Sequence, residues 1–479
     1  MNRLYAALLA AVPFVANAQQ TTPPRIETVI TGGSVIDVKT GAIRTNQTIA
    51  IGAGSIVAIT DKPGELQTRG ARRIDARGKF VIPGLWDMHM HFGGGDSLIA
   101  ENRNLIPLYI ANGITTIRDA AGDIPLSVLA WRDSIDKGQM EGPTMFTSGP
   151  KLEGPKTIWP GTIEVATRPE VDAALDRLVG LRVNFVKLTD NMLKPELFLY
   201  AVGEIKKRGL KSSAHIPQPI AVRDAIDGGL GSIEHMSYAI KAGSPREAEL
   251  AKTRAAGTIA DRIPAENAMA VFDENIAMET YRLMAQRGTA ITPTLTISRT
   301  LAYLDTDDHT KDPYLAFIGP GLQSTYKGRI ETAARADTAA VARRHRSYEF
   351  AKSKVPLLQR AGVLIFAGTD AGFLNSFVYP GFALHEEMEL LQSSGLTPLQ
   401  TLQATTINGA RWLGKDSRSA TIEVAKVADI VILDSNPLTD INATRDIRGV
   451  MLKGKYFDRA ALDVMLADVK KRAATAARP

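Results

Sequence analysis

Short apolar runs alternate with amphipathic segments through the middle of the chain, between residues 81 and 414. The runs have the length and the β-branched content that favour strands, and many of the segments between them have the 3.6-residue period of helices. Eight runs qualify as strands: residues 81–89, 113–119, 143–149, 184–188, 210–215, 231–235, 289–295 and 362–370. Successive strand–helix units in one stretch predict an α/β fold, a (β/α)8 TIM barrel over residues 81–414.

The two ends of the chain have a different pattern, in which short alternating segments are separated by glycine-containing turns. Residues 26–80 and residues 415–460 both show it. The first set of strands lacks partners nearby in the sequence. We therefore expect the two sets to pair as one small β-sandwich beside the barrel, and residues 461–479 to form a C-terminal helix or tail.

Two connections within the barrel are much longer than the others, residues 236–288 and residues 296–361. The first is rich in Ala, Glu and Arg, and the second contains an Ala/Arg-rich segment, residues 329–354, that favours one long helix. Insertions at the mouth of a barrel usually form the sides of the active site or cover it. We therefore expect both connections to lie above the active site.

The first residues have the pattern of a secretory signal rather than of a folded element. Arg3 is followed by an apolar run, residues 4–15, and then by Ala16-Asn17-Ala18. A basic start, a short apolar core and small residues at a cleavage site predict a signal peptide over residues 1–18, and hence a periplasmic or secreted protein. No other apolar run is long enough to span a membrane, so we expect no membrane contact after cleavage.

Composition narrows the choice of partners. The 479 residues include no cysteine, which excludes a disulfide framework. The net charge is +6, but the basic residues are scattered and not interleaved with aromatic residues, so the charge does not indicate binding to nucleic acid. The expected partner is a small-molecule substrate, and the formation of a homo-oligomer is left open.

Potential metal ligands stand where the predicted strands end. His89 and His91 belong to the run FVIPGLWDMHMHF, and residues two apart on a strand point to the same side. Further along, candidate residues end four more predicted strands: Lys187, His215, His235 and Asp370. Because barrel active sites form at the C-terminal ends of the strands, these side chains are expected to converge. Histidine and carboxylate sets of this kind suit zinc.

The same residues belong to motifs that resemble a known family. The chain is similar to the metal-dependent amidohydrolase superfamily, in the branch near imidazolonepropionase and the Xaa-Pro and Xaa-Arg dipeptidases. The matching pieces run in order over most of residues 26–460: VIPGLWDMHMHF, GITTIRDA, NFVKL, SSAH, SIEHMS, FAGTDAG, LHEEMELLQSSGLTP, LQATTINGARWLG and IEVAKVADIVILD. No single piece is specific, but the combined set is.

The resemblance implies a site with two divalent metal ions, for which zinc is the expected metal. His89, His91 and Asp370 would hold one ion, and His215 and His235 would hold the other. Lys187, carboxylated by carbon dioxide, would bridge the two ions, because an unmodified ammonium group would be repelled by them. A metal-bridging hydroxide would attack the substrate, with Asp370 as general base and then general acid.

The implied reaction is hydrolysis of an amide bond, most simply in a dipeptide or an N-acyl amino acid. Imidazolonepropionase-like members lack the bridging lysine, so Lys187 favours the dipeptidase side. The dipeptidases carry a further histidine after the fifth strand, where this chain has residues 216–219, IPQP. That departure keeps two alternatives open: a lactone, cyclic amide or carbamate hydrolase, and a non-catalytic periplasmic binder of a metal or ligand.

Four further residues carry expectations of their own. Tyr238, three residues after His235, is a candidate substrate contact. Arg118 and Asp119 end the second barrel strand, where they suggest a structural ion pair near the site. His385 lies within a predicted helix and is expected to pack there rather than to act in catalysis.

Overall fold

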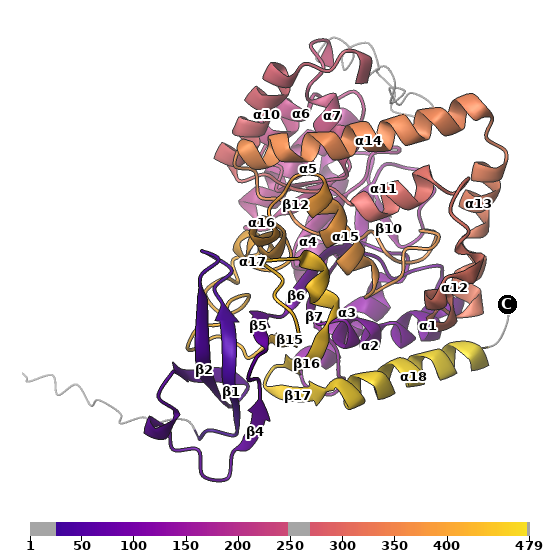
Figure 1. Ribbon diagram of the computed structural model, residues 1–479. Helices are drawn as coiled ribbons and strands as arrows, with labels where there is room; N and C mark the ends of the chain where they lie inside the picture. The colour runs from indigo at the N-terminus through magenta and orange to yellow at the C-terminus, as the bar shows by residue number, and fades with distance from the viewer. Residues whose placement is uncertain (1–24, 248–268, 477–479) are drawn as a thin grey trace, which may run out of the picture.

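The computed structural model describes residues 25–247 and 269–476, and shows a barrel with a β-rich part beside it (Figure 1). The predicted signal peptide and the middle of the 236–288 connection lie outside the described residues. In Figure 1 the β-rich part occupies the lower left of the molecule, and the barrel and its helices occupy the rest. No helix among the described residues is long and apolar enough to cross a membrane.

The β-rich part is one hydrogen-bonded sheet that contains strands from both ends of the chain. Its strand order is β17-β16-β15-β5-β1-β2-β3, with β4 paired to β1. The strands are β1 (Thr28–Ile36), β2 (Ile43–Gly52), β3 (Ser55–Thr60), β4 (Arg72–Asp75), β5 (Phe80–Pro83), β15 (Ile430–Leu433), β16 (Ile447–Leu452) and β17 (Lys455–Asp458). The two ends meet where β5 pairs antiparallel with β15, Val81 opposite Ile432. Both side chains are buried in the core of this part, which accounts for the alternating apolar pattern at the two ends of the sequence.

The barrel strands form two parallel sheets. One is β6 (Leu85–Met90), β7 (Ile114–Asp119) and β8 (Thr144–Thr147). The other has the order β10-β9-β11-β12-β13-β14, with β9 (Lys151–Glu153), β10 (Thr162–Glu164), β11 (Val186–Leu188), β12 (Ser212–Ala214), β13 (Ser232–Glu234) and β14 (Ala290–Thr292). Between the two sheets, the amide of Asn184 donates to the carbonyl of Thr147. The predicted barrel and its parallel strands are thereby confirmed.

The eighth predicted strand, residues 362–370, is not a strand in the structure. It forms only isolated bridges, Ile365 with Ile291 and, just after it, Ala371 with Met90. The ladder is interrupted because the amide of Ala367 donates to the carbonyl of Ala404 instead of to a strand. The segment still closes the barrel between β14 and β6. At Gly368 an added Cβ would lie 2.7 Å from the Cβ of His89, so this close approach requires glycine.

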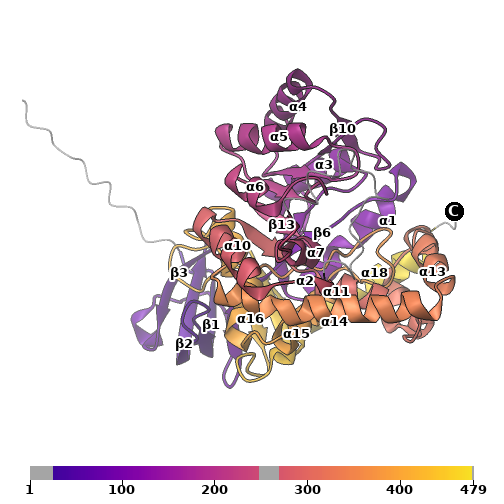
Figure 2. The ribbon, with the colours of Figure 1, turned by 90° about the horizontal axis from the view of Figure 1, so that it is seen from above.

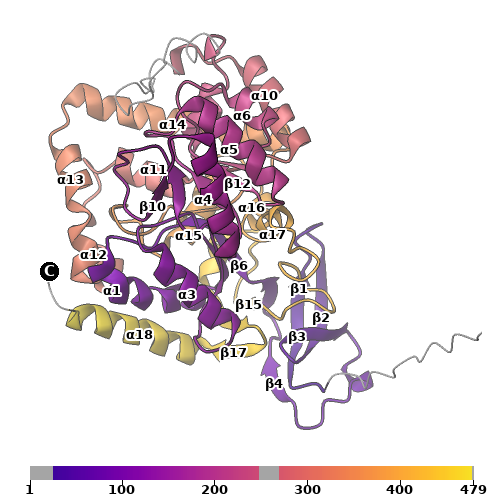
Figure 3. The same ribbon diagram turned by 180° about the vertical axis from the view of Figure 1, so that it is seen from behind.

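Helices surround the barrel, and the view from behind shows α3, α4 and α5 on its outer surface (Figure 3). α3 and α5 begin at proline, and α4 has proline at its second position and a capping box between Thr167 and Glu170. The helices before the segment 248–268 are α1 (Ile99–Asn104), α2 (Ile106–Ala111), α3 (Pro125–Asp136), α4 (Arg168–Gly180), α5 (Pro195–Lys207), α6 (Val222–Asp227) and α7 (Met236–Lys241). After it come α10 (Glu274–Arg287), α11 (Leu295–Ala302), α12 (Pro320–Ser324), α13 (Lys327–Ala334), α14 (Thr338–Arg360), α15 (Ala383–Ser393), α16 (Pro398–Ala404), α17 (Ile407–Trp412) and α18 (Arg459–Thr475).

The segment expected to form one helix, residues 329–354, is divided between α13 and α14. The helix breaks because Asp337 accepts a hydrogen bond from the amide of Ala340 and begins α14 as its N-cap. From above, α14 crosses the molecule as a long rod close to α11 (Figure 2). The C-terminal segment is a helix, α18, which packs against α2.

Candidate active site

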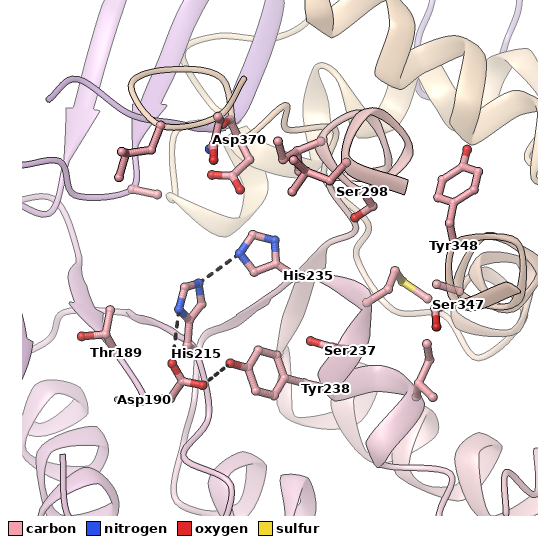
Figure 4. Close-up of a pocket in the computed structure, with 18 of the residues that line it drawn as sticks. Thr189, Asp190, His215, His235, Ser237, Tyr238, Ser298, Ser347, Tyr348 and Asp370 are labelled. Atoms are coloured by element: carbon pink, nitrogen blue, oxygen red, sulfur yellow. Dashed lines mark hydrogen bonds and ion pairs between the residues drawn. The ribbon is translucent and has the colours of Figure 1, made fainter. Parts of the chain in front are cut away.

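The predicted site residues come together at the C-terminal ends of the barrel strands. His89 belongs to β6, Lys187 to β11, and His215 and His235 directly follow β12 and β13. Nε2 of His91 lies 3.1 Å from Nε2 of His89 and 2.8 Å from Oδ1 of Asp370. Nε2 of His215 lies 3.0 Å from Nε2 of His235, as Figure 4 shows. The four imidazoles therefore point the same nitrogen toward a common centre.

The other ring nitrogen of each histidine has an oxygen partner. Nδ1 of His89 lies 2.7 Å from Oε2 of Glu234, and Nδ1 of His91 lies 2.9 Å from the carbonyl of Ala121. Nδ1 of His235 lies 2.7 Å from Oγ1 of Thr294, and Nδ1 of His215 lies 3.7 Å from Oδ1 of Asp190. Oxygen partners of this kind fix the ring orientation of metal-ligating histidines and leave Nε2 free to coordinate.

Glu234 is a site residue that the sequence reasoning missed. Its fully buried carboxylate accepts hydrogen bonds from Arg118 Nη2 at 2.9 Å and from the hydroxyls of Ser213 and Ser232. Burial alone would raise the pKa of Glu234, but the Arg118 guanidinium and His89 hold that pKa well below its usual range. The sequence did carry a signal, because Glu234 is a lone carboxylate inside the buried run GSIEH.

The expected ion pair between Arg118 and Asp119 is wrong. Neighbouring residues on a strand point to opposite faces, so Arg118 points into the barrel toward Glu234, whereas Asp119 accepts from the hydroxyl of Thr147 at 2.8 Å. His385, as expected, packs within the protein: it is 2% exposed and lies 3.1 Å from the carbonyl of Asn112 through Nε2.

Lys187, on β11, has an unsatisfied amino group. The residue is 2% exposed, and its Nζ has no hydrogen-bond partner among the described residues. Burial lowers the pKa of this amine to about 8. A buried polar atom without a partner is costly and calls for an explanation, such as a modification or a bound group.

Burial favours the neutral form of three of the four imidazoles. It lowers the pKa of His91 to about 4, and it lowers the pKa values of His215 and His235. His89 is the exception: burial acts against its charge, but the carboxylates of Glu234 and Asp370 raise its pKa. Asp370 stays ionised: burial disfavours its charge, but its contacts with His89 and His91 hold its pKa well below the usual range. Neutral imidazoles and an ionised carboxylate are the protonation states that metal coordination requires.

Several residues of the site have a backbone conformation that side chains disfavour. The backbone angle φ is positive at His235 (74°) and Asp370 (58°). It is also positive at two of the residues that orient histidines, Ala121 (74°) and Thr294 (50°). Strained backbone of this kind persists where surrounding structure enforces it, and it gathers at functional sites. Among the described residues, His89, His235 and Asp370 also form a group whose ligand atoms lie close enough to share one metal ion.

A cavity of about 750 Å³ opens above these residues. Its lining includes every predicted site residue except His89, which lies beneath the others. Tyr238 lines it too, and its hydroxyl donates to Oδ2 of Asp190 at 2.8 Å (Figure 4). Both long connections contribute to its walls, through α7 on one side and through α11, α13 and α14 on the other. The volume suits a small organic substrate.

Comparison with known proteins agrees with this geometry. The model of the amidohydrolase family matches residues 80–456, which is most of the chain and contains the whole site. The chain belongs to the amidohydrolase family. The resemblance inferred from the sequence motifs is thereby confirmed, and the protein is a hydrolytic enzyme that acts on C–N bonds.

The sequence identity between this chain and individual known proteins is low. The ochratoxinase of Aspergillus niger is 22% identical over 426 residues, which cover 77% of this chain and 73% of that protein. A putative prolidase from Bifidobacterium longum has a similar structure, with a TM-score of 0.68 and 23% identity over 93% of this amidohydrolase and 100% of that chain. A Xaa-Pro dipeptidase with bound methionine has a TM-score of 0.66 and 20% identity over 90% and 99% of the two chains. At these identities the structures show a shared fold.

Proposed function

We propose that this amidohydrolase holds two divalent metal ions and hydrolyses the amide bond of a dipeptide or an N-acyl amino acid. The proposed metal of the native enzyme is zinc. The observation that carries the proposal is the convergence of four imidazoles and the ionised Asp370 at one cavity, which the unpartnered amine of Lys187 also lines. The ochratoxinase, prolidase and dipeptidase relatives support an amide bond as the target.

The residues present fit such a pair of ions. His89, His91 and Asp370 would hold one ion, and His215 and His235 the other, since each imidazole has its Nδ1 directed to an oxygen and its Nε2 directed inward. Lys187 fits the bridging position as a carbamate, formed when its amine nitrogen bonds to the carbon of carbon dioxide and releases a proton. That reaction explains why a buried amine is left without a hydrogen-bond partner.

The bound ions would lower the pKa of water and polarise the carbonyl group of the substrate. Asp370 takes the proton from the attacking water and passes it to the leaving amine. Its position suits this task, because it lines the cavity while His91 orients its carboxylate at 2.8 Å. Tyr238 lines the same cavity beside His215, and we assign it to contact with the substrate.

A substrate screen tests this function. The full-length protein, loaded with zinc, is assayed against dipeptides and N-acyl amino acids, and in parallel against lactones, cyclic amides and carbamates. We expect turnover of the first two classes to dominate, and elemental analysis to find about two metal ions per chain. Turnover confined to lactones or carbamates would replace the amide assignment. Tight binding without turnover of any class would favour a non-catalytic binder.

A further inference from the structure

Three arginines line the wall of the cavity that belongs to the second long connection. Arg329 lies on α13, and Arg343 and Arg344 lie on α14. None of them forms a hydrogen bond or an ion pair with another residue in the described ranges, and Nε and Nη2 of Arg344 are buried without a partner. Lys241, which also lines the cavity, is engaged, because it donates to the carbonyls of Gln218 and Ile220. The arginines are therefore available to an anionic ligand.

Hydrogen bonds join the segment after Asp370 to the start of α13, the helix that carries Arg329. The segment that follows Asp370 contacts the residues just before α13: the amide of Leu374 donates to Oγ1 of Thr325 at 2.9 Å, and the hydroxyl of Ser376 donates to the carbonyl of Tyr326 at 3.1 Å. Arg329 lies three residues after Tyr326 in the sequence and is half-buried. It lines the same cavity as Asp370, whose charge opposes the lowering of the Arg329 pKa by burial.

This arrangement matches the chemistry of one leaving group. Asp370 gives a proton to the leaving amine under the function proposed above. If that amine belongs to an α-amino acid, its carboxylate lies within about 4 Å of the nitrogen, because only the Cα separates the two groups. A guanidinium in the wall of the same cavity as Asp370 can then bind the carboxylate, and its planar fork suits bidentate binding. Apolar residues of the same cavity, Ile297, Leu301 and Phe373, suit an apolar side chain.

We propose that Arg329, assisted by Arg343 and Arg344, binds the free carboxylate of the amino acid that the enzyme releases. The inference rests on the proposed amide hydrolysis and narrows it: the substrates carry an unblocked C-terminal carboxylate, and a carboxamide or ester at that position is a poor substitute. Arg329 determines the preference for a free carboxylate, and it is not one of the metal ligands.

The test compares N-acetyl-L-leucine with N-acetyl-L-leucinamide, measured as release of leucine or leucinamide by the zinc-loaded full chain. We expect the free acid to be preferred at least 10-fold in kcat/KM. Arg329→Gln should lower kcat/KM for the acid by about 10- to 100-fold, the usual contribution of a hydrogen bond to a charged group, and change that for the amide little. Arg329→Lys, which keeps the charge, should retain part of the preference.

Arg335→Gln provides the matched control, because Arg335 is exposed at the end of α13 and does not line the cavity. It should behave as the wild type. Equal turnover of acid and amide by the wild type, or equal losses on both in Arg329→Gln with unchanged metal content, would overturn the inference. If the wild type hydrolyses neither compound, calorimetric binding of the two compounds decides the inference separately from the amide function, which the substrate screen tests. Tighter binding of the acid that is lost in Arg329→Gln supports it, and equal binding of both compounds contradicts it.

Discussion

Nδ1 of His89 lies 2.7 Å from Oε2 of Glu234, whose carboxylate also binds Arg118. Arg118 in turn lies over the rings of Phe185, Phe366 and Trp412 beneath the site. A buried carboxylate thus connects the floor of the barrel to a metal-ligand candidate. Glu234 orients His89 and balances the charge of Arg118 at the same time.

Glu234→Gln keeps the size of the side chain but removes its charge. The amide orients His89 less well, so we expect metal affinity to fall by about 10- to 100-fold, as it does when such an orienting group is lost. The buried Arg118 is left without a counter-charge, which should lower the free energy of unfolding by about 3 kcal/mol. Metal competition titration and urea denaturation measure the two effects. Ser232→Ala removes one hydrogen bond to the same carboxylate and serves as the control; an equal loss of affinity there would show that the charge is not the cause.

Tyr238→Phe removes the hydroxyl that donates to Asp190 while leaving the ring against His215. If the tyrosine contacts substrate, KM or substrate preference should change by several-fold and the metal content should not change. Steady-state kinetics and elemental analysis on the same preparation separate the two roles. A fall in metal content would instead make Tyr238 a support for Asp190 and His215.

His385 provides a prediction about pH. Burial lowers the pKa of His385 to about 4, below the value of about 6.5 expected in the unfolded chain. The unfolded state therefore binds a proton more readily, and the contribution of this residue to stability is lost as the pH falls from about 6.5 toward 4. Between pH 7.5 and pH 5 the loss should be about 2 kcal/mol. Denaturation of wild type and His385→Gln at both pH values should show a smaller loss in the variant; parallel losses would contradict the assignment.

Export is a prediction of the sequence alone. We propose that residues 1–18 are removed during secretion, because Arg3, the apolar run and Ala16-Asn17-Ala18 form the pattern of a signal peptide. Mass spectrometry of the protein purified from the periplasm or medium of an expressing bacterium should show Gln19 at its N-terminus. An Ala18→Leu variant, with a large residue at the cleavage position, should be processed poorly. A protein that retains Met1 and stays in the cytoplasm would refute the proposal.

The sequence predicted the features that depend on local periodicity. His89 and His91 were found because residues two apart share a face of a strand, and the barrel followed from the succession of apolar runs. The contact between Glu234 and His89 joins residues 145 positions apart, and no local pattern encodes it. The division between α13 and α14 depends on whether Asp337 caps a helix or stays exposed within one. The sequence did not predict that Arg329, Arg343 and Arg344 line the cavity, for the same reason: contacts between distant segments set their place.

The central claim is that Lys187, as a carbamate, bridges two metal ions. Elemental analysis of zinc-loaded Lys187→Ala tests it most directly, with Lys151→Ala as a control that removes another lysine of the cavity wall. We predict about two ions per chain in the wild type and the control, and one or none in Lys187→Ala, with activity reduced by several orders of magnitude because the bridging oxygens are gone. Lys187→Arg should fail equally, since a guanidinium stays charged and cannot form the carbamate. Two ions and near-normal turnover in Lys187→Ala would contradict the account.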